Sequence, residues 1–242
     1  MSIAEKLVTV SENASRAVEL NRDLETILAG GDTGGKSEMD EFWDMYQNYG
    51  NLGDYSFVFA NVCWNSKTFR PKYSIRPTNA YMIFRLSNVE QDLVEWMAAL
   101  GVELDFSNCT NMSYAFQQSK FTRLGIINAT NTVALSNAFI DAKKLKTIDK
   151  LVLKSNGQNT FSGTFNGCSA LENITIEGAI GNNIDFSTCT KLTHDSLMSI
   201  INHLQDKTGA STEPILTIGT TNYNKLTAEE IKIATDKGWE VV

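Results

Sequence analysis

Proline, histidine and long apolar runs are scarce in this sequence of 242 residues, and each scarcity excludes a class of structure or site. Three prolines argue against long extended linkers. No window approaches the roughly 18 consecutive apolar residues that a transmembrane helix needs, so we expect no membrane insertion. The start, from Met1 to Lys6, lacks the basic stretch and apolar run of a secretory signal peptide. We therefore expect synthesis in a cytoplasm, without a signal peptide.

Positive charge is also in deficit. The chain has 21 Lys and Arg residues against 28 Asp and Glu residues, with a net charge of -7 and a pI near 4.9. This charge would repel phosphate backbones, so we expect no nucleic-acid partner. Hydrophobic residues make up 42% and charged residues 20%, which is ordinary for a soluble globular protein.

Motifs for catalysis and metal binding are missing. His194 and His203 are nine residues apart, which places them on opposite sides of one helix and away from a common ion. The four cysteines form no Cys-x-x-Cys pair and are Cys63, Cys109, Cys168 and Cys189. No Ser-His-Asp order, Gly-x-Ser-x-Gly elbow or phosphate loop occurs. We expect no metal, no cofactor and no enzymatic activity.

One pattern recurs through the middle of the chain: Phe, two variable residues, a small residue, two variable residues, then Leu or Met. It fits Phe106/Cys109/Met112, Phe139/Ala142/Leu145, Phe165/Cys168/Leu171 and Phe186/Cys189/Leu192. Phe116 begins a further copy with one residue deleted. Cys, Ala and Ser share the small position, so a small buried group is the requirement, and a free cysteine meets it. We expect the copies to contribute to one core, with their phenylalanines stacked in register.

The spacing of the copies predicts a repeat architecture. Phe116, Phe139 and Phe165 are 23 and 26 residues apart, inside the range of leucine-rich repeats. Two copies lead into β-prone runs at residues 151–153 and 174–176. A unit of one turn and one strand cannot bury itself, whereas stacked units share a core. We predict an α/β leucine-rich-repeat-like solenoid with short strands over residues 101–193.

Both flanks of the predicted solenoid differ from it in pattern. Residues 194–242 predict an α/β cap, with a helix opened by Thr193 and His194, a strand at 215–218, a helix at 227–234 and a strand at 239–242. Residues 37–100 predict an N-terminal capping region. Caps of this kind are needed because an uncapped last repeat leaves its core open.

Residues 1–29 predict a coiled-coil helix for oligomerisation. Its apolar heptad alternates steps of four and three residues through Ile3, Leu7, Val10, Ala14, Ala17, Asn21, Leu24 and Leu28. An isolated helix of this length is marginal in water, so the seam needs a partner, and we predict a homotrimer. Asn21 in the seam would favour a dimer, and a helix folded back on its own solenoid is the further alternative. The glycine-rich residues 30–36 predict a hinge.

Aromatic and basic residues gather in one stretch of the N-terminal capping region. They are Trp64, Lys67, Arg70, Lys72, Tyr73 and Arg76. Aromatic residues and Arg are enriched at contact surfaces, so this stretch is a candidate interaction surface. The alternative is that these residues form an irregular capping strand with scattered cations, which would show the same mixture of residues.

The phrase Phe-x-x-Cys/Ala-x-x-Leu-x-x-Ile, at residues 139–148 and 165–174, resembles the BspA-like leucine-rich-repeat proteins of bacterial surfaces. The resemblance extends over roughly residues 100–215. Flanking phrases at residues 42–50, 63–65, 225–231 and 237–239 resemble proteins encoded in gut Firmicutes genomes and their prophages. These families imply adhesion or recognition of proteins and glycans.

The lack of a signal peptide and of a wall-anchoring tail favours a phage particle over a bacterial surface. We therefore expect a non-enzymatic phage or prophage structural protein, associated with the tail and carried on the virion. Its partners would be copies of itself, other virion proteins, and a host protein or glycan. The alternative is a bacterial cell-surface adhesin.

Overall fold

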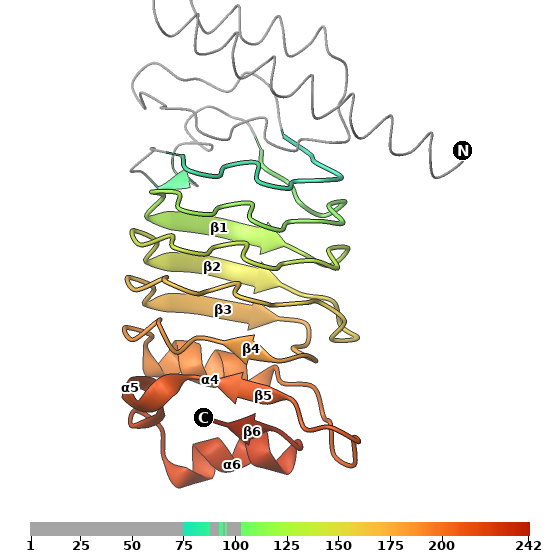
Figure 1. Cartoon of the computed structure of the whole chain (residues 1–242), viewed down its shortest axis with the longest axis vertical. Helices are drawn as coiled ribbons and strands as arrows, with labels where there is room; N and C mark the ends of the chain where they lie inside the picture. Colours follow the sequence, from blue (N-terminus) through green and yellow to red (C-terminus); the bar gives the residue numbers. More distant parts are fainter. Residues whose placement is uncertain (1–74, 88–91, 94, 96–102) are drawn as a thin grey trace, which may run out of the picture.

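The computed structural model describes residues 75–87, 92, 93, 95 and 103–242. In Figure 1 the described chain makes successive circuits that lie one above another, and it ends among helices. We call each circuit a layer, residues 75–193 the stack and residues 194–242 the cap. Among the described residues, no helix is long and apolar enough to cross a membrane.

One side of the stack is a parallel sheet. Its strands are β1 (Arg123–Asn128), β2 (Thr147–Val152) and β3 (Asn173–Glu177), hydrogen-bonded in that order. Leu124, Ile148 and Ile174 lie opposite one another and are all buried. The buried residues therefore form one apolar face against the core, while the remaining strand residues form the opposite face.

The other side of the stack is built from return segments, which are residues 80–87, 112–119, 135–142 and 161–168. Backbone N–H groups donate to the next layer from Phe84 to Ala115, from Phe116 to Ala138 and from Phe139 to Thr164, with N···O distances of 2.7, 2.7 and 3.0 Å. The third residue of each segment has a positive φ: Met82, Tyr114, Asn137 and Gly163. The same hydrogen bonds and the same φ make the four segments structurally equivalent.

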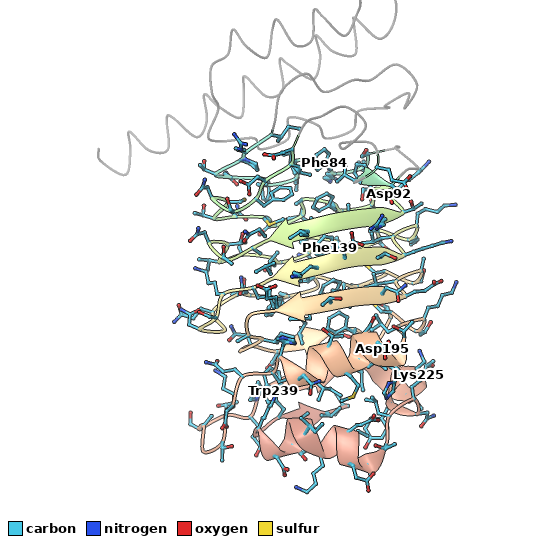
Figure 2. All side chains as sticks on the ribbon, turned by 180° about the vertical axis from the view of Figure 1, so that it is seen from behind. Phe84, Asp92, Phe139, Asp195, Lys225 and Trp239 are labelled. Atoms are coloured by element: carbon cyan, nitrogen blue, oxygen red, sulfur yellow. The ribbon has the colours of Figure 1, made fainter. Side chains whose placement is uncertain are left out.

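A column of phenylalanine rings lies inside the layers. It consists of Phe84, Phe116, Phe139, Phe165 and Phe186, with successive ring centroids 5.4, 5.5, 5.4 and 4.5 Å apart. Neighbouring planes differ by 22° or less. Figure 2 shows Phe84 and Phe139 inside the stack. These rings contribute much of the core, because each buries a large apolar area and stacks on its neighbours.

Phe106 corrects the predicted register. It is buried, but its ring meets Phe116 edge-on at 74° and lies outside the column. The N–H of Cys109 donates to Phe106 O (2.8 Å), just as the N–H of Thr132 donates to Ala129 O (3.1 Å) in the turn after β1. Phe106 and Cys109 therefore occupy the corner that follows a strand. Their match in sequence to the Phe186 copy reflects the same local turn at a different place.

Contacts between layers correct two further predictions. Met112 lies in a return segment, where its N–H donates to Ala134 O (2.9 Å), so it is not the equivalent of Leu145. Stacked layers also precede residue 101, where the solenoid was expected to begin. Ile75 already pairs with Leu104, and Phe84 already belongs to the column.

Polar side chains join the layers at the corner after the strands. Each donates to a carbonyl of the layer before: Thr132 to Cys109 (2.8 Å), Asn159 to Thr132 (2.8 Å) and Asn182 to Asn159 (2.8 Å). Thr132 and Asn159 are fully buried. Because a buried carbonyl without a partner is costly, this ladder fixes the spacing of the layers.

The cap combines helices with a second parallel sheet. Its elements are α4 (His194–Asn202), β5 (Ile215–Thr217), α5 (Gly219–Tyr223), α6 (Ala228–Asp236) and β6 (Glu240–Val241). The second sheet has the order β4-β5-β6 and begins in the stack with β4 (Ile184–Asp185). The helices and strands expected after residue 193 overlap α4, β5, α6 and β6, whereas α5 was not expected.

Candidate functional site

The outward face of β1, β2 and β3 is a regular surface that extends over three layers. We call it the outer sheet face. Ile126 on β1 has 61% of its surface exposed and lies opposite Lys150 on β2. Lys150 Nζ contacts Glu177 Oε2 at 2.7 Å, which carries the contact across to β3. The outer sheet face therefore combines one exposed aliphatic residue with a neighbouring ion pair.

An ion group holds the edge of this face where the strands begin. Arg123 binds Asp149 through two parallel hydrogen bonds, Nε–Oδ1 at 2.8 Å and Nη2–Oδ2 at 2.7 Å. Its Nη1 also donates to Asp92 Oδ2 at 3.0 Å. The two carboxylates, Asp149 first, raise the pKa of Arg123 above its ordinary value. The group joins three layers, so the charges on this edge have a fixed position.

Two hollows flank the outer sheet face. The first has a volume of about 350 Å³ and lies between β2, β3 and the start of α4, and its polar lining is Thr147, Asp149, Asn173, Thr175, Thr193, Asp195 and Ser196. The second has a volume of about 340 Å³ and lies after the strands, with Thr130, Lys154, Ser155, Asn156 and Glu177 among its lining residues. Hydroxyl, amide and carboxylate groups in such hollows are suited to hydrogen bonding with a polar ligand.

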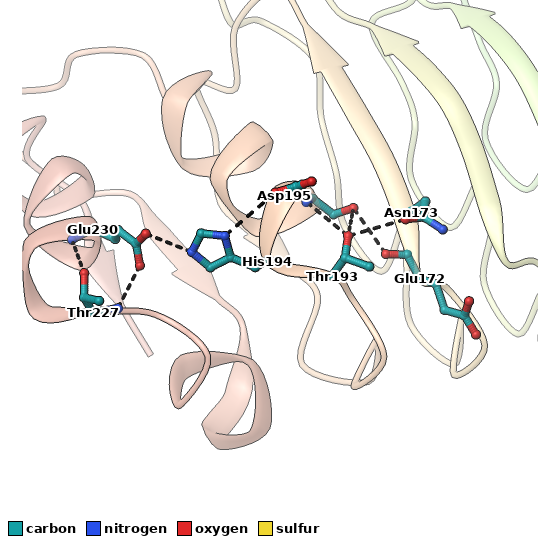
Figure 3. Close-up of polar contacts among 8 residues, drawn as sticks. Glu172, Asn173, Thr193, His194, Asp195, Thr227 and Glu230 are labelled. Carbon is teal, nitrogen blue, oxygen red and sulfur yellow. Dashed lines mark hydrogen bonds and ion pairs between the residues drawn. The ribbon is translucent and has the colours of Figure 1, made fainter.

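Helix α4 closes the lower edge of the first sheet. Ser196 Oγ accepts the N–H of Ile174 (3.0 Å) and donates to Glu172 O (3.2 Å). Ser199 Oγ accepts the N–H of Ile176 (2.9 Å). Figure 3 shows the polar contacts around Thr193, whose side chain caps the helix. These hydroxyls occupy the groups that another strand would bind, so a partner cannot extend the sheet at this edge.

The histidines support the cap. His194 Nε2 lies 2.8 Å from Glu230 Oε1, and Glu230 also accepts the N–H of Thr227 at 2.8 Å (Figure 3). The Thr227 N–H and then His194 hold the pKa of Glu230 below its ordinary value. His203 Nδ1 lies 2.8 Å from Ser199 O. In the described part of the chain, no three or more His, Cys, Asp or Glu side chains are grouped to hold a metal ion.

The residues predicted for the repeat core are all buried. They are Phe106, Cys109, Met112, Phe139, Leu145, Phe165, Cys168, Leu171, Phe186, Cys189 and Leu192. Cys109, Cys168 and Cys189 are free thiols. The neighbouring Cys189 thiol and then burial raise the pKa of Cys168 well above its ordinary value. A thiol with a raised pKa is a poor nucleophile in the folded protein.

Most of the predicted interaction residues lie outside the described chain. The whole heptad of residues 3–28 and the hinge at 30–36 do so, as do Trp64, Lys67, Arg70, Lys72 and Tyr73. Arg76 is described, and its Nη2 forms an exposed ion pair with Glu103 Oε2 at 2.7 Å. This ion pair joins the first described layer to the next.

Sequence reasoning did not single out the outer sheet face. Arg123, Ile126 and Lys150 carry it, and none belongs to the recurring pattern. A signal was present in β2, where Ile148 and Leu151 are buried and Asp149 and Lys150 between them point outward. Comparison of the chain with protein-family models, with curated proteins and with solved structures finds no match in any of the three.

Proposed function

We propose that the chain is a non-enzymatic recognition protein whose leucine-rich-repeat-like solenoid presents the outer sheet face to a ligand on another molecule. One observation carries the proposal: successive strands place exposed side chains side by side in register, as with Ile126 and Lys150. Stacked repeats create extended binding surfaces of this kind. The two hollows at either end of the strands add polar groups for a host protein or glycan.

The sheet face is a better candidate than the sheet edge. Helix α4 occupies the lower edge, where Ser196 and Ser199 accept the N–H groups of Ile174 and Ile176 that a partner strand would otherwise bind. On the face, Ile126 provides exposed apolar area, while Arg123 and Lys150 are held by carboxylates in fixed positions. Preorganised charges cost little entropy on binding, which favours specific recognition.

The resemblance noted in the sequence supports a phage or prophage structural protein, associated with the tail and carried on the virion. In this arrangement the residues before the stack join the chain to copies of itself, as a homotrimer, and to other virion proteins. The outer sheet face then contacts the surface of the bacterial host.

Binding of the labelled full-length protein to intact Firmicutes cells and to immobilised mucin tests the proposal. Ile126→Glu should reduce cell binding at least tenfold, because a charged side chain replaces the exposed apolar side chain of the face. The matched control is Val133→Glu, since Val133 is also exposed, at 52%, but lies outside the sheet. Equal binding by the two variants would contradict the proposed face. Binding to mucin and not to cells would favour the adhesin.

A further inference from the structure

We propose that Cys168 and Cys189 are a site of covalent modification, at which oxidation by a small-molecule disulfide of the glutathione class joins two successive layers through a disulfide bond. The inference goes beyond the proposed function and does not depend on it. It rests on the geometry of the last two layers of the stack.

The two cysteines occupy equivalent positions in adjacent layers. Each follows a column phenylalanine by three residues, and the N–H of each donates to the carbonyl of that phenylalanine, at 3.1 Å for Cys168 and 2.8 Å for Cys189. The rings of Phe165 and Phe186 are 4.5 Å apart, the shortest spacing in the column. Backbone segments that pair through hydrogen bonds are about 4.7–4.9 Å apart, which falls within the Cα separation of about 4.4–6.8 Å that a disulfide bond requires.

Direct contacts hold these two layers together beside the thiols. Thr188 Oγ1 accepts the N–H of Gly167 at 2.9 Å, and Cys189 Sγ lies 3.6 Å from Phe165 O. Cys168 Sγ donates to Phe139 O at 3.0 Å, in the layer before its own. The Cys189 thiol therefore points towards the layer of Cys168, and rotation of the Cys168 side chain away from Phe139 O would bring the two sulfur atoms together.

Cys109 provides an internal comparison. It occupies the corner after a strand, and Thr132 takes the equivalent place in the next layer and binds the carbonyl of Cys109. Cys168 and Cys189 instead belong to the column of small residues that runs through Ser87, Ser119 and Ala142. In the described chain, these two are the consecutive cysteines of that column.

The reaction balances as two thiol–disulfide exchanges. The thiolate of one cysteine attacks oxidised glutathione, which forms a mixed disulfide and releases one glutathione thiolate. The thiolate of the other cysteine then attacks the protein sulfur of that mixed disulfide and releases the second glutathione. Two protein thiols are oxidised, one glutathione disulfide is reduced to two thiols, and the two protons pass to solvent. Both cysteines are fully buried, so the exchange takes place while the last layers are open during folding.

Refolding of the full chain tests the site. The protein carries Cys63→Ser, so that Cys109, Cys168 and Cys189 are its three cysteines, and it is unfolded with reductant and refolded with oxidised and reduced glutathione. Circular dichroism confirms the native state, and the protein is then alkylated in denaturant and analysed by peptide mass spectrometry. We expect one alkylated thiol, Cys109, and a linked pair of peptides that contain residues 168 and 189.

Two variants make the result specific. Cys109→Ala should retain the linked pair, whereas Cys189→Ala should abolish it. In the Cys189→Ala protein, Ala142→Cys should restore a link to Cys168, because residue 142 precedes it in the same column and Cys168 Sγ already reaches Phe139 O at 3.0 Å. Three alkylated thiols in the natively refolded protein would overturn the proposal, and so would a link that involves Cys109.

Discussion

The stack and the cap solve the same problem, the pairing of buried backbone groups, in different ways. Within the stack, the backbone of one layer pairs with the backbone of the next, as where the N–H of Phe139 donates to Thr164 O. At the end of the first sheet, side chains of the cap replace the missing strand beside β3. Ser196 and Ser199 accept the N–H groups that β3 would otherwise donate to another strand.

Elsewhere in the cap, lysine and tryptophan side chains also donate to backbone carbonyls. Lys237 Nζ donates to the carbonyls of Ile201 (3.1 Å) and Asn202 (2.8 Å) at the end of α4, and Trp239 Nε1 donates to Gln205 O (2.8 Å). Backbone pairing is the same for any sequence, so the layers can repeat with few constraints. Termination needs particular side chains, which explains why the cap has a sequence of its own.

The largest expected effect is in the stack. Phe139→Ala removes a fully buried ring that stacks on both neighbours, so we expect a loss of about 3–5 kcal/mol in the free energy of unfolding. Urea denaturation followed by circular dichroism measures it, with the exposed Val133→Ala as control. A loss below about 1 kcal/mol would mean that the column does not hold the layers together.

A buried asparagine side chain should contribute about equally to the free energy of unfolding in the stack and in the cap. Asn159 in the stack bonds to Thr132 O, Ala129 O and Lys154 N, and Asn222 in the cap bonds to Cys189 O, Ile218 O and Lys225 Nζ.

Replacement of either asparagine by Ala should reduce the free energy of unfolding by about 2–3 kcal/mol, because buried carbonyls lose their donors. The same urea titration measures both variants. A large loss for Asn159→Ala with none for Asn222→Ala would show that the cap adjusts where the stack cannot.

A smaller effect is expected at the boundary between the regions. Ser196→Ala leaves the N–H of Ile174 and the carbonyl of Glu172 without their partner, at a cost of about 1–2 kcal/mol. Hydrogen exchange at the Ile174 amide should accelerate, while exchange inside β1 stays unchanged. The exposed Ser211→Ala is the control. Unchanged exchange at Ile174 would mean that the hydroxyl does not replace a strand.

The smallest effect is a pH dependence inside the cap. The pKa of Glu230 in the folded state is below its ordinary value near 4.5, so its stabilising contribution is present above that value and is lost as the pH falls through the lowered one. Glu230→Gln should remove this part of the acid destabilisation in melting temperatures recorded from neutral pH downward. Glu229→Gln changes an exposed neighbour and should keep the wild-type profile.

The recurring pattern located part of the column correctly. Phe139, Phe165 and Phe186 are each followed by a small residue three positions later and by Leu six positions later, so their equivalence is visible in the sequence. Phe116 has a corner one residue shorter, and Phe84 lacks the aliphatic residue of the pattern. Phe106 was placed wrongly because the turn from Phe106 to Cys109 has the same hydrogen bond as the turn from Phe186 to Cys189. Spacing alone does not say at which corner of a layer a turn lies.

The candidate site was harder to predict than the core. Thr193 indicated the start of α4, because its side chain caps the helix. The outer sheet face depends on which residues of β1 and β2 lie opposite each other, and this register is set by hydrogen bonds across layers. Gly125 and the exposed Ile126 also break the simple alternation in β1. Only the assembled layers bring Ile126 beside Lys150.

The positive-φ positions of the return segments limit which residues can lie above one another in successive layers. Gly163 lies beneath Asn137, whose Oδ1 would be 2.3 Å from a Cβ at position 163, and Gly167 lies in the same way beneath Asp141 at 2.4 Å. The equivalent positions Met82, Tyr114 and Asn137 carry side chains, so a tandem copy of residues 135–142 inserted below the original would fit only if the Asn137 side chain moved aside. Addition of a layer at this junction therefore requires a change in the Asn137 rotamer.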